Sequence, residues 1–247
     1  MDISKKTLII LPHLDDEFAL VPLIKMLTKY SPKNLKIIYC AERTHDSKIK
    51  RIKRRSENAK ALKILGCQQD NITYLNDFFE IQDLKLFYSS KKIFNFIKEL
   101  HLKEKFNYIV TLNFEGGHPD HDALALIIDR FSNEFKLNPI YIPAYNNRKT
   151  MLIPISVFRP LKSQIENFTI KTFSLFCWKD CLKVAYTYKT EKKAFIKLLP
   201  FILLQVIFSK KIYISNSLSV RSFDYNKSLS KKRYGASRKE IIESIKW

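Results

Sequence analysis

Two spacings of hydrophobic residues alternate along residues 1–145 of the chain. Short apolar runs rich in β-branched residues are typical of buried strands, and they are separated by stretches with apolar residues at helical spacing. The predicted strands are Thr7–Leu11, Leu35–Ala41, Ile72–Leu75, Tyr108–Leu112 and Pro139–Ile142. The predicted helices are Asp16–Tyr30, Lys48–Leu65 with Gly66 as its C-cap, Phe87–Leu102 and Asp122–Phe131.

This alternation predicts an α/β fold: a Rossmann-like, mostly parallel sheet flanked by helices. In a doubly wound sheet of order 3-2-1-4-5, strands one and four are neighbours, and ligands bind at their carboxyl ends. Residues that follow Leu11 and Leu112 are therefore expected to meet at one site, although about a hundred residues separate them.

The pattern becomes less regular in the C-terminal part. Residues 173–185 and 189–208 are predicted to be helical, 212–214 to form a strand, and the tail 231–247 to be basic and helix-forming. Because no linker rich in Gly, Pro or Ser intervenes, we predict one domain over 1–247, with 160–247 as a less regular C-terminal elaboration.

Composition is that of a folded globular protein, with 46% hydrophobic and 13% aromatic residues. The four cysteines show no zinc-ribbon or disulfide-framework spacing, which suits a reducing compartment. The N-terminal residues enter a predicted strand without a signal-peptide pattern. We therefore expect a cytoplasmic protein.

The formal net charge of +20 has two interpretations, an anionic partner or many solvated lysines. Nucleic acid is a poor candidate, because no helix-turn-helix, zinc-finger or base-stacking pattern accompanies the charge. The most apolar stretch, Leu198–Phe208, lies between Lys193 and Lys197 on one side and Lys210 and Lys211 on the other. It is too short to span a bilayer, so it is either a core helix or a helix peripheral to an anionic membrane on its cytoplasmic face.

Candidate chemistry is concentrated in two runs, His13–Glu17 and His118–His121, which directly follow predicted strands one and four. The chain has five histidines, and three of them lie in these two runs; His45 and His101 lie outside such motifs and are predicted to be surface residues. Imidazole and carboxylate bind divalent metals and carry protons, which points to a metal-dependent hydrolase. An isolated Asp-Asp-Glu run would more simply cap a helix.

Two of the four glycines, Gly116 and Gly117, precede the second run. Such a pair allows a sharp turn or a close backbone approach, with a flexible loop as the plain alternative.

The two runs resemble the motifs of the LmbE-like or PIG-L-type de-N-acetylases. Pro12-His13-Leu14-Asp15-Asp16-Glu17 is similar to (P/A)-H-P-D-D-E, with Leu14 where the family has proline, and His118-Pro119-Asp120-His121 is identical to H-P-D-H. A weaker similarity covers Arg54, Glu57 and Gly66, as R-x-x-E followed by L-G, and an acidic residue, Asp83. The resemblance extends over roughly residues 5–130.

The resemblance implies a zinc ion held by His13, Asp16 and His121, with another divalent metal such as Fe²⁺ as the alternative. It further implies Asp15 as the general base that acts on metal-bound water. His118 would be the cationic or hydrogen-bond-donating group at the oxyanion, and Asp120 would hold His118 in the required tautomer. Arg54 and Asp83 are candidates for substrate contact, although Arg54 lies in a basic stretch, Lys48–Arg55, that also suits a solvated helix face.

The function that follows from the resemblance is a zinc-dependent hydrolase that removes an N-acetyl group from an amino sugar. The substrate would be a small-molecule glycoconjugate or a nucleotide- or lipid-linked sugar. Two alternatives stay open: a sugar- or phosphate-binding module that keeps the fold without catalysis, and a hydrolase of another amide or ester on a lipid-linked sugar.

Overall fold

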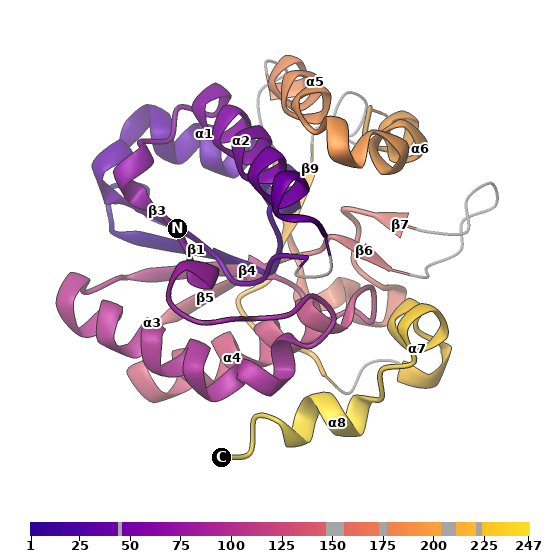
Figure 1. The fold of residues 1–247 in the computed structure, drawn as a ribbon. Coiled ribbons are helices and arrows are strands. Elements are labelled where there is room, and N and C mark those ends of the chain that lie inside the picture. Colours follow the sequence, from indigo (N-terminus) through magenta and orange to yellow (C-terminus); the bar gives the residue numbers. More distant parts are fainter. Residues whose placement is uncertain (44–45, 147–155, 173–176, 204–210, 221–223) are drawn as a thin grey trace.

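A five-stranded parallel sheet forms the centre of the computed structural model (Figure 1), which describes residues 1–43, 46–146, 156–172, 177–203, 211–220 and 224–247. The strand order is β3-β2-β1-β4-β5, and every neighbouring pair runs parallel. This confirms the predicted α/β fold and sheet order. The strands are β1 (Thr7–Leu11), β2 (Leu35–Tyr39), β3 (Ile72–Tyr74), β4 (Tyr108–Leu112) and β5 (Asn138–Ile142).

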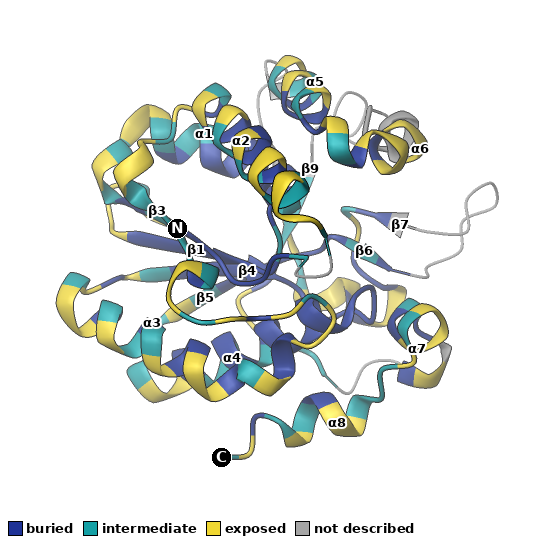
Figure 2. Ribbon diagram, in the orientation of Figure 1, coloured by how far each residue is buried: buried dark blue, intermediate teal, exposed yellow. Residues whose placement is uncertain are grey.

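Helices cover both faces of this sheet (Figures 1 and 2). Alternate residues of β1 belong to different cores: Ile9 and Leu11 pack toward α1 and α2, whereas Leu8 and Ile10 pack toward α3 and α4. β1 is buried along its whole length because both of its faces are covered, as expected for a parallel sheet. The helices are α1 (Val21–Tyr30), α2 (Lys48–Ile64), α3 (Ser90–Glu104) and α4 (Pro119–Phe135).

Prolines determine where α1 and α4 begin, and both starts differ from those predicted from the hydrophobic pattern. The predicted helix at Asp16 is a 3-10 helix over Asp16–Leu20, and α1 begins only at Val21, with Pro22 in its first turn. Within a continuous helix the Pro22 ring would clash with the carbonyl of Phe18. Conversely, α4 begins at Pro119 and not at Asp122, because proline suits the first helical position and His118 provides the N-cap.

Gly66 terminates α2 as predicted, although the C-cap itself is Leu65 and Gly66 is the residue after it. Gly66 has φ +84°, and its N–H donates to the carbonyl of Lys63. The next amide, of Cys67, donates to Leu62. These two bonds form a Schellman motif, which satisfies carbonyls that the end of α2 leaves free.

The C-terminal part adds elements around the sheet. α5 (Cys177–Thr187) lies beside α1 and α2, and α6 (Lys192–Leu203) lies next to α5; α7 (Leu229–Tyr234) and α8 (Arg238–Glu243) lie on the side of α4 (Figure 1). The predicted strand at 212–214 pairs antiparallel with a strand that was not predicted, and a second short ribbon follows β5. These strands are β8 (Thr169–Thr172) with β9 (Lys211–Ile214), and β6 (Tyr145–Asn146) with β7 (Ser156–Val157).

Two predictions for the C-terminal part extend beyond the described residues. The helix expected over 189–208 consists of a 3-10 turn at Lys189–Glu191 and then α6, and 204–210 are not described. The side chains of 198–203 are not described either, so the choice between core and surface for Leu198–Phe208 stays open. Among the helices of the described chain, none has the length and apolar character that crossing a bilayer requires.

His101 is not the surface residue that we predicted. It is 9% exposed on the inner face of α3, and its ring packs against Phe106, Phe131 and Phe135. Burial lowers the pKa of this imidazole, with a further contribution from Lys105. The neutral ring serves as a core aromatic, which its helical spacing from Ile97 and Phe94 could have indicated. His45 lies outside the described residues.

Candidate metal centre and active site

The two histidine-containing runs meet at the carboxyl ends of β1 and β4, which are adjacent in the sheet. His13 lies in the turn after β1, His118 caps α4, and His121 lies in the first turn of α4. The ring centroid of His13 is 4.7 Å from that of His118 and 5.5 Å from that of His121. The structure therefore brings together side chains that are about a hundred residues apart in sequence, as the sheet order predicted.

Asp16 lies between two of these imidazoles. Its Oδ2 atom is 3.2 Å from Nδ1 of His13, and its Oδ1 atom is 3.2 Å from Nε2 of His121. The backbone N–H of His13 also donates to Asp16 Oδ2 at 2.8 Å, which fixes the carboxylate relative to the turn. Asp16 thus contacts both imidazoles, each through a separate carboxylate oxygen. Two imidazoles and one carboxylate are a donor set suited to zinc.

The outer nitrogen of His13 shows that the site fits a metal. Nε2 lies 3.0 Å from Asp120 Oδ2 and 3.1 Å from Asp83 Oδ1, so it carries the proton and donates to these carboxylates. Nδ1 faces Asp16 Oδ2, and because the pKa of His13 is raised, Nδ1 also carries a proton when no metal is bound; a metal would replace that proton. A histidine held by a carboxylate on its far side is the usual partner arrangement of a metal ligand.

Two groups of metal-binding side chains occur among the described residues, and both include His13. One is His13, His118 and His121, and the other is His13, Asp83 and Asp120; within each group the potential ligand atoms lie within 4.8 Å of one another. Asp16 belongs to neither group, so the predicted set of His13, Asp16 and His121 stays a prediction, and the site offers other donors as well.

The electrostatics of the site favour a cation. Burial by itself would lower the pKa of His13, but hydrogen bonds to Asp120, Asp16 and Asp83 outweigh it, so this pKa lies well above its usual value. Burial would likewise raise the pKa of Asp16, but His121 and His13 lower it far below its usual range. The carboxylates around His13 therefore stabilise positive charge at its ring, and a divalent metal would supply such charge in place of the ring's second proton.

The predicted role of Asp120 needs a correction. Its carboxylate accepts hydrogen bonds from His13 and from the backbone amides of Leu84 and Leu86, at 2.7 and 3.0 Å, and not from His118. Its backbone N–H donates to Nδ1 of His118 at 3.2 Å. The N-cap geometry of α4 turns the main chain, and not the carboxylate, toward the His118 ring.

His118 is a neutral hydrogen-bond donor in this arrangement. Burial, together with the nearby His13 and His121, lowers the pKa of His118 well below its usual value. Because Nδ1 accepts from the Asp120 amide, the ring proton is on Nε2, which lies 3.9 Å from Asp83 Oδ1. Of the two alternatives in the prediction, a cation or a donor, this geometry favours the donor.

Asp15 and Arg54 lie next to each other at this site. Arg54 Nη2 is 3.7 Å from Asp15 Oδ1, and the Asp15 side chain, 27% exposed, is more accessible than those of Asp16 and Asp83. Arg54 is buried, which excludes the alternative of a solvated helix face. Its second partner is Glu191, from the turn between α5 and α6.

Asp83 is also brought into the site. Besides His13, it contacts Arg43, whose Nε lies 3.4 Å from Asp83 Oδ2. Arg43 Nη1 is 2.8 Å from Glu191 Oε1, so Glu191 joins both arginines. We missed Arg43 and Glu191, and only an acidic residue in an otherwise lysine-rich segment hinted at the latter.

Glu17, the last residue of the first run, forms buried hydrogen bonds that stabilise the turn after β1. Its carboxylate accepts hydrogen bonds from Tyr39 at 2.9 Å, from Asn58 at 3.3 Å and from Tyr188, and burial raises its pKa to about 8. Tyr188 and Asn58 also donate to the carbonyl of Leu14. The backbone between His13 and Asp15 is therefore held by α2 and by the turn after α5.

Glu115 forms buried hydrogen bonds that stabilise the loop before the second run. Its carboxylate is buried and accepts from the amide of Ala144 at 2.7 Å and from Asn146 Nδ2 at 2.9 Å. These bonds join the loop before His118 to the chain that follows β5. Burial raises the pKa of Glu115 to about 7.

This shift predicts a measurable pH dependence of stability. Between the ordinary carboxyl pKa of 4.5 and about 7, the folded protein keeps a proton on Glu115 that the unfolded chain loses, so stability falls as pH rises through this window. The Glu115→Gln side chain is neutral at every pH, so the variant should lack this pH dependence. Across the window, the difference in free energy of unfolding between variant and wild type should change by up to about 3 kcal/mol. Urea unfolding across the window measures it, with Glu134→Gln at an exposed position as control. Parallel curves for Glu115→Gln and wild type would contradict the assignment.

Comparisons with known proteins agree with this architecture. The model of the PIG-L family, described as GlcNAc-PI de-N-acetylase, matches residues 8–132, about half of the chain and the part that contains both histidine runs. The chain therefore belongs to the PIG-L family and is a hydrolase of the N-deacetylase class. No curated protein matches the chain by sequence.

Solved structures share the fold at low sequence identity. N,N'-diacetylchitobiose deacetylase from Pyrococcus horikoshii is 19% identical with a TM-score of 0.56, over 86% of this chain and 82% of its own. The A40926 pseudoaglycone deacetylase is 12% identical with a TM-score of 0.56, over 86% and 97%. The 4-carboxy-2-hydroxymuconate hydratase GalB from Pseudomonas putida is 10% identical with a TM-score of 0.53, over 89% and 98%. The presence of a hydratase in this group means that the fold alone does not determine the reaction.

Proposed function

We propose that the protein is a zinc-dependent deacetylase that removes the N-acetyl group from an amino sugar and releases acetate and a free amine. One observation carries the proposal: Asp16 lies 3.2 Å from both His13 and His121, and the adjacent Asp15 is the more exposed carboxylate. This is a metal-binding donor set with a neighbouring base. Fe²⁺ would suit the same two imidazoles and one carboxylate.

His13, Asp16 and His121 would hold the metal. When bound there, it would lower the pKa of a water molecule toward about 7 and polarise the acetyl carbonyl. Asp120 keeps the proton of His13 on Nε2, so Nδ1 stays available as a ligand.

Asp15 would transfer protons, and His118 would stabilise the negative charge that develops on the acetyl oxygen. Asp15 would accept the proton of the attacking water and return it to the leaving amine. Arg54 lies 3.7 Å from this carboxylate. His118 would donate from Nε2 to the oxyanion of the tetrahedral intermediate.

Arg54, Asp83 and the additional Arg43 would contact the sugar. Arg43 is the most accessible of the three, with 36% of its side chain exposed, and a guanidinium suits a phosphate or a sugar hydroxyl. A phosphate-bearing or lipid-linked amino sugar would also agree with the high positive charge of the chain.

Removal of the metal tests the proposal. The purified protein should release acetate from N-acetylglucosamine conjugates, lose this activity on complete chelation and regain it when Zn²⁺ or Fe²⁺ is added back. Activity that survives verified metal removal would overturn the mechanism. Metal-dependent release of another acyl group from the same sugars, without acetate release, would favour hydrolysis of a different amide or ester.

A further inference from the structure

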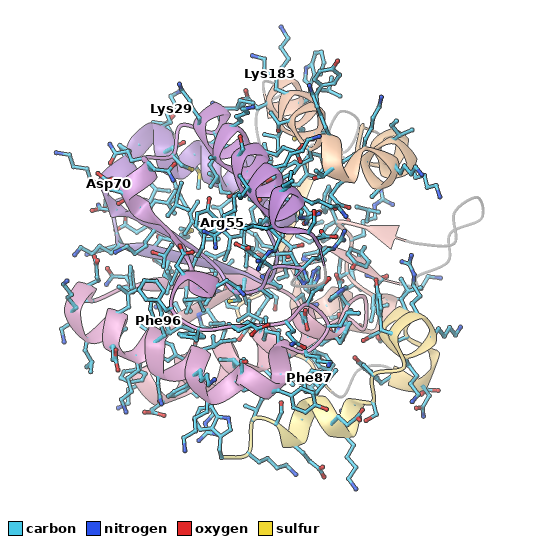
Figure 3. The ribbon with its side chains drawn as sticks, in the orientation of Figure 1. Lys29, Arg55, Asp70, Phe87, Phe96 and Lys183 are labelled. Carbon is cyan, nitrogen blue, oxygen red and sulfur yellow. The ribbon has the colours of Figure 1, made fainter. Side chains whose placement is uncertain are left out.

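The turn and helices that follow the sheet form a strongly basic surface. Residues 182–197, which include the end of α5 and the first half of α6, carry the single acidic residue Glu191, and it is buried against Arg43 and Arg54. The lysines of this segment are all exposed, and Figure 3 shows Lys183 at the outer side of α5. They are Lys183, Lys189, Lys192, Lys193 and Lys197.

An apolar groove of about 1070 Å³ runs between these lysines. Its walls come from the C-terminal end of α2, from α5 and from α6, and Lys183, Lys189 and Lys192 line it as well. Two large residues at the groove are strongly exposed: Tyr186 at 83% and Ile196 at 58%. The apolar walls include Ile64, Leu182, Ala185, Tyr188 and Phe195.

We propose that this α5–α6 face docks on an anionic lipid surface, with the lysines on the headgroups and the groove open to an acyl chain. The charge is complementary to such a surface, because three lysines line the groove, two more are exposed in the same segment, and its single acid is buried. Exposed Tyr and Ile among lysines are typical of proteins that lie at a membrane interface, where an aromatic ring has one polar and one apolar end.

The groove is structurally joined to the candidate active site. Tyr188 lines the groove and also donates to the carbonyl of Leu14, between His13 and Asp15. The next residues, Thr190 and Glu191, bind Glu57 and Arg54 on α2. Docking through this face would therefore hold the site beside the lipid surface, where a lipid-linked sugar would be presented.

Co-sedimentation of the full-length protein with vesicles tests this inference without reference to catalysis. Phosphatidylcholine vesicles that contain phosphatidylglycerol should bind the protein, and phosphatidylcholine alone should bind it much more weakly. Binding should decline as salt rises, because exposed charges are screened over about 8–10 Å. A protein that stays in the supernatant at low salt, or binds both vesicles equally, overturns the proposal.

Charge reversal on the proposed face provides the matched comparison. Each lysine near an anionic surface contributes roughly a fivefold gain in partitioning, so Lys189→Glu with Lys192→Glu should lower binding more than about tenfold. Lys91→Glu with Lys92→Glu changes the net charge equally on α3, at the other side of the sheet, and should leave binding within about threefold of wild type. Equal losses in the two double variants would show that only net charge matters and would overturn the assigned face.

The apolar contribution is tested separately with Tyr186→Ser combined with Ile196→Ser. Both side chains are exposed, so the fold should survive, and circular dichroism checks this. The variant should bind phosphatidylglycerol vesicles at least about tenfold more weakly, since it loses two apolar contacts that would enter the lipid. Undiminished binding would overturn the role of the groove.

Discussion

Asp15→Asn should abolish deacetylation while the purified protein keeps its metal. The substitution removes the proton acceptor but retains the size and shape of the side chain, so kcat should fall by roughly a hundredfold to ten-thousandfold. The neighbouring ligands are unchanged, and Asp16 stays fixed by the amide of His13. Acetate release measures the loss, and elemental analysis of the same sample measures the metal.

Substitution of the proposed ligands should give the opposite combination. His13→Ala and His121→Ala each remove one of the two imidazoles on Asp16, so the metal content itself should fall together with activity. Asp70→Asn, at an exposed turn before β3 (Figure 3), controls for the loss of one carboxylate elsewhere. If Asp15→Asn lost its metal, Asp15 would be a ligand; if it kept near wild-type kcat, another group would be the base.

Gly117→Ala should damage both stability and activity. A Cβ at this position would overlap the carbonyl oxygen of Tyr145 and lie 3.1 Å from its carbonyl carbon, so the backbone before His118 or the chain after β5 must move. Overpacking of this kind costs about 1–3 kcal/mol, and we expect the upper end because the clash is with backbone. A displacement of His118 and His121 by about 1 Å would further lower kcat/KM by about a hundredfold.

Gly66→Ala separates the two effects. Gly66 lies at the end of α2 with φ +84°, and a Cβ there would be 3.3 Å from Thr28 Oγ1. The variant should lose about 1–2 kcal/mol of unfolding free energy because alanine is strained in this conformation. It should keep wild-type kcat/KM, since the turn is not part of the site. Urea unfolding and acetate release measure both variants; a Gly117→Ala protein with normal turnover would refute the close-approach argument.

The sequence by itself predicted the frame of this protein. Apolar runs of strand length gave the positions of β1, β2, β4 and β5 within two residues, because strands buried on both faces need continuous hydrophobic residues. The alternation with helices gave the parallel sheet and its order. Because all strands of such a sheet point the same way, the runs after β1 and β4 had to end at one edge, and the structure brings His13, Asp16 and His121 together there.

Only the tertiary structure decided which groups within the site contact each other. Asp120 directs its carboxylate to His13 and its amide to His118, a choice made by the start of α4 at Pro119. Glu191 reaches Arg54 from 137 residues away because α5 packs on α2. Spacing along the chain cannot predict such contacts, since they depend on how separate elements pack.

The dependence on packing also explains why His101 was misplaced and why the sequence indicated no role for Glu17 and Glu115. His101 was predicted to be a surface residue because it lies outside the two histidine-containing runs, whereas its ring packs against three Phe rings. Glu17 and Glu115 are buried by partners from distant elements, Tyr188 and Asn146 among them. The local pattern of residues determines which face of a helix or strand is apolar. The neighbours of a polar group on that face are determined only when the elements pack together. Those neighbours set the charge of the polar group and its role.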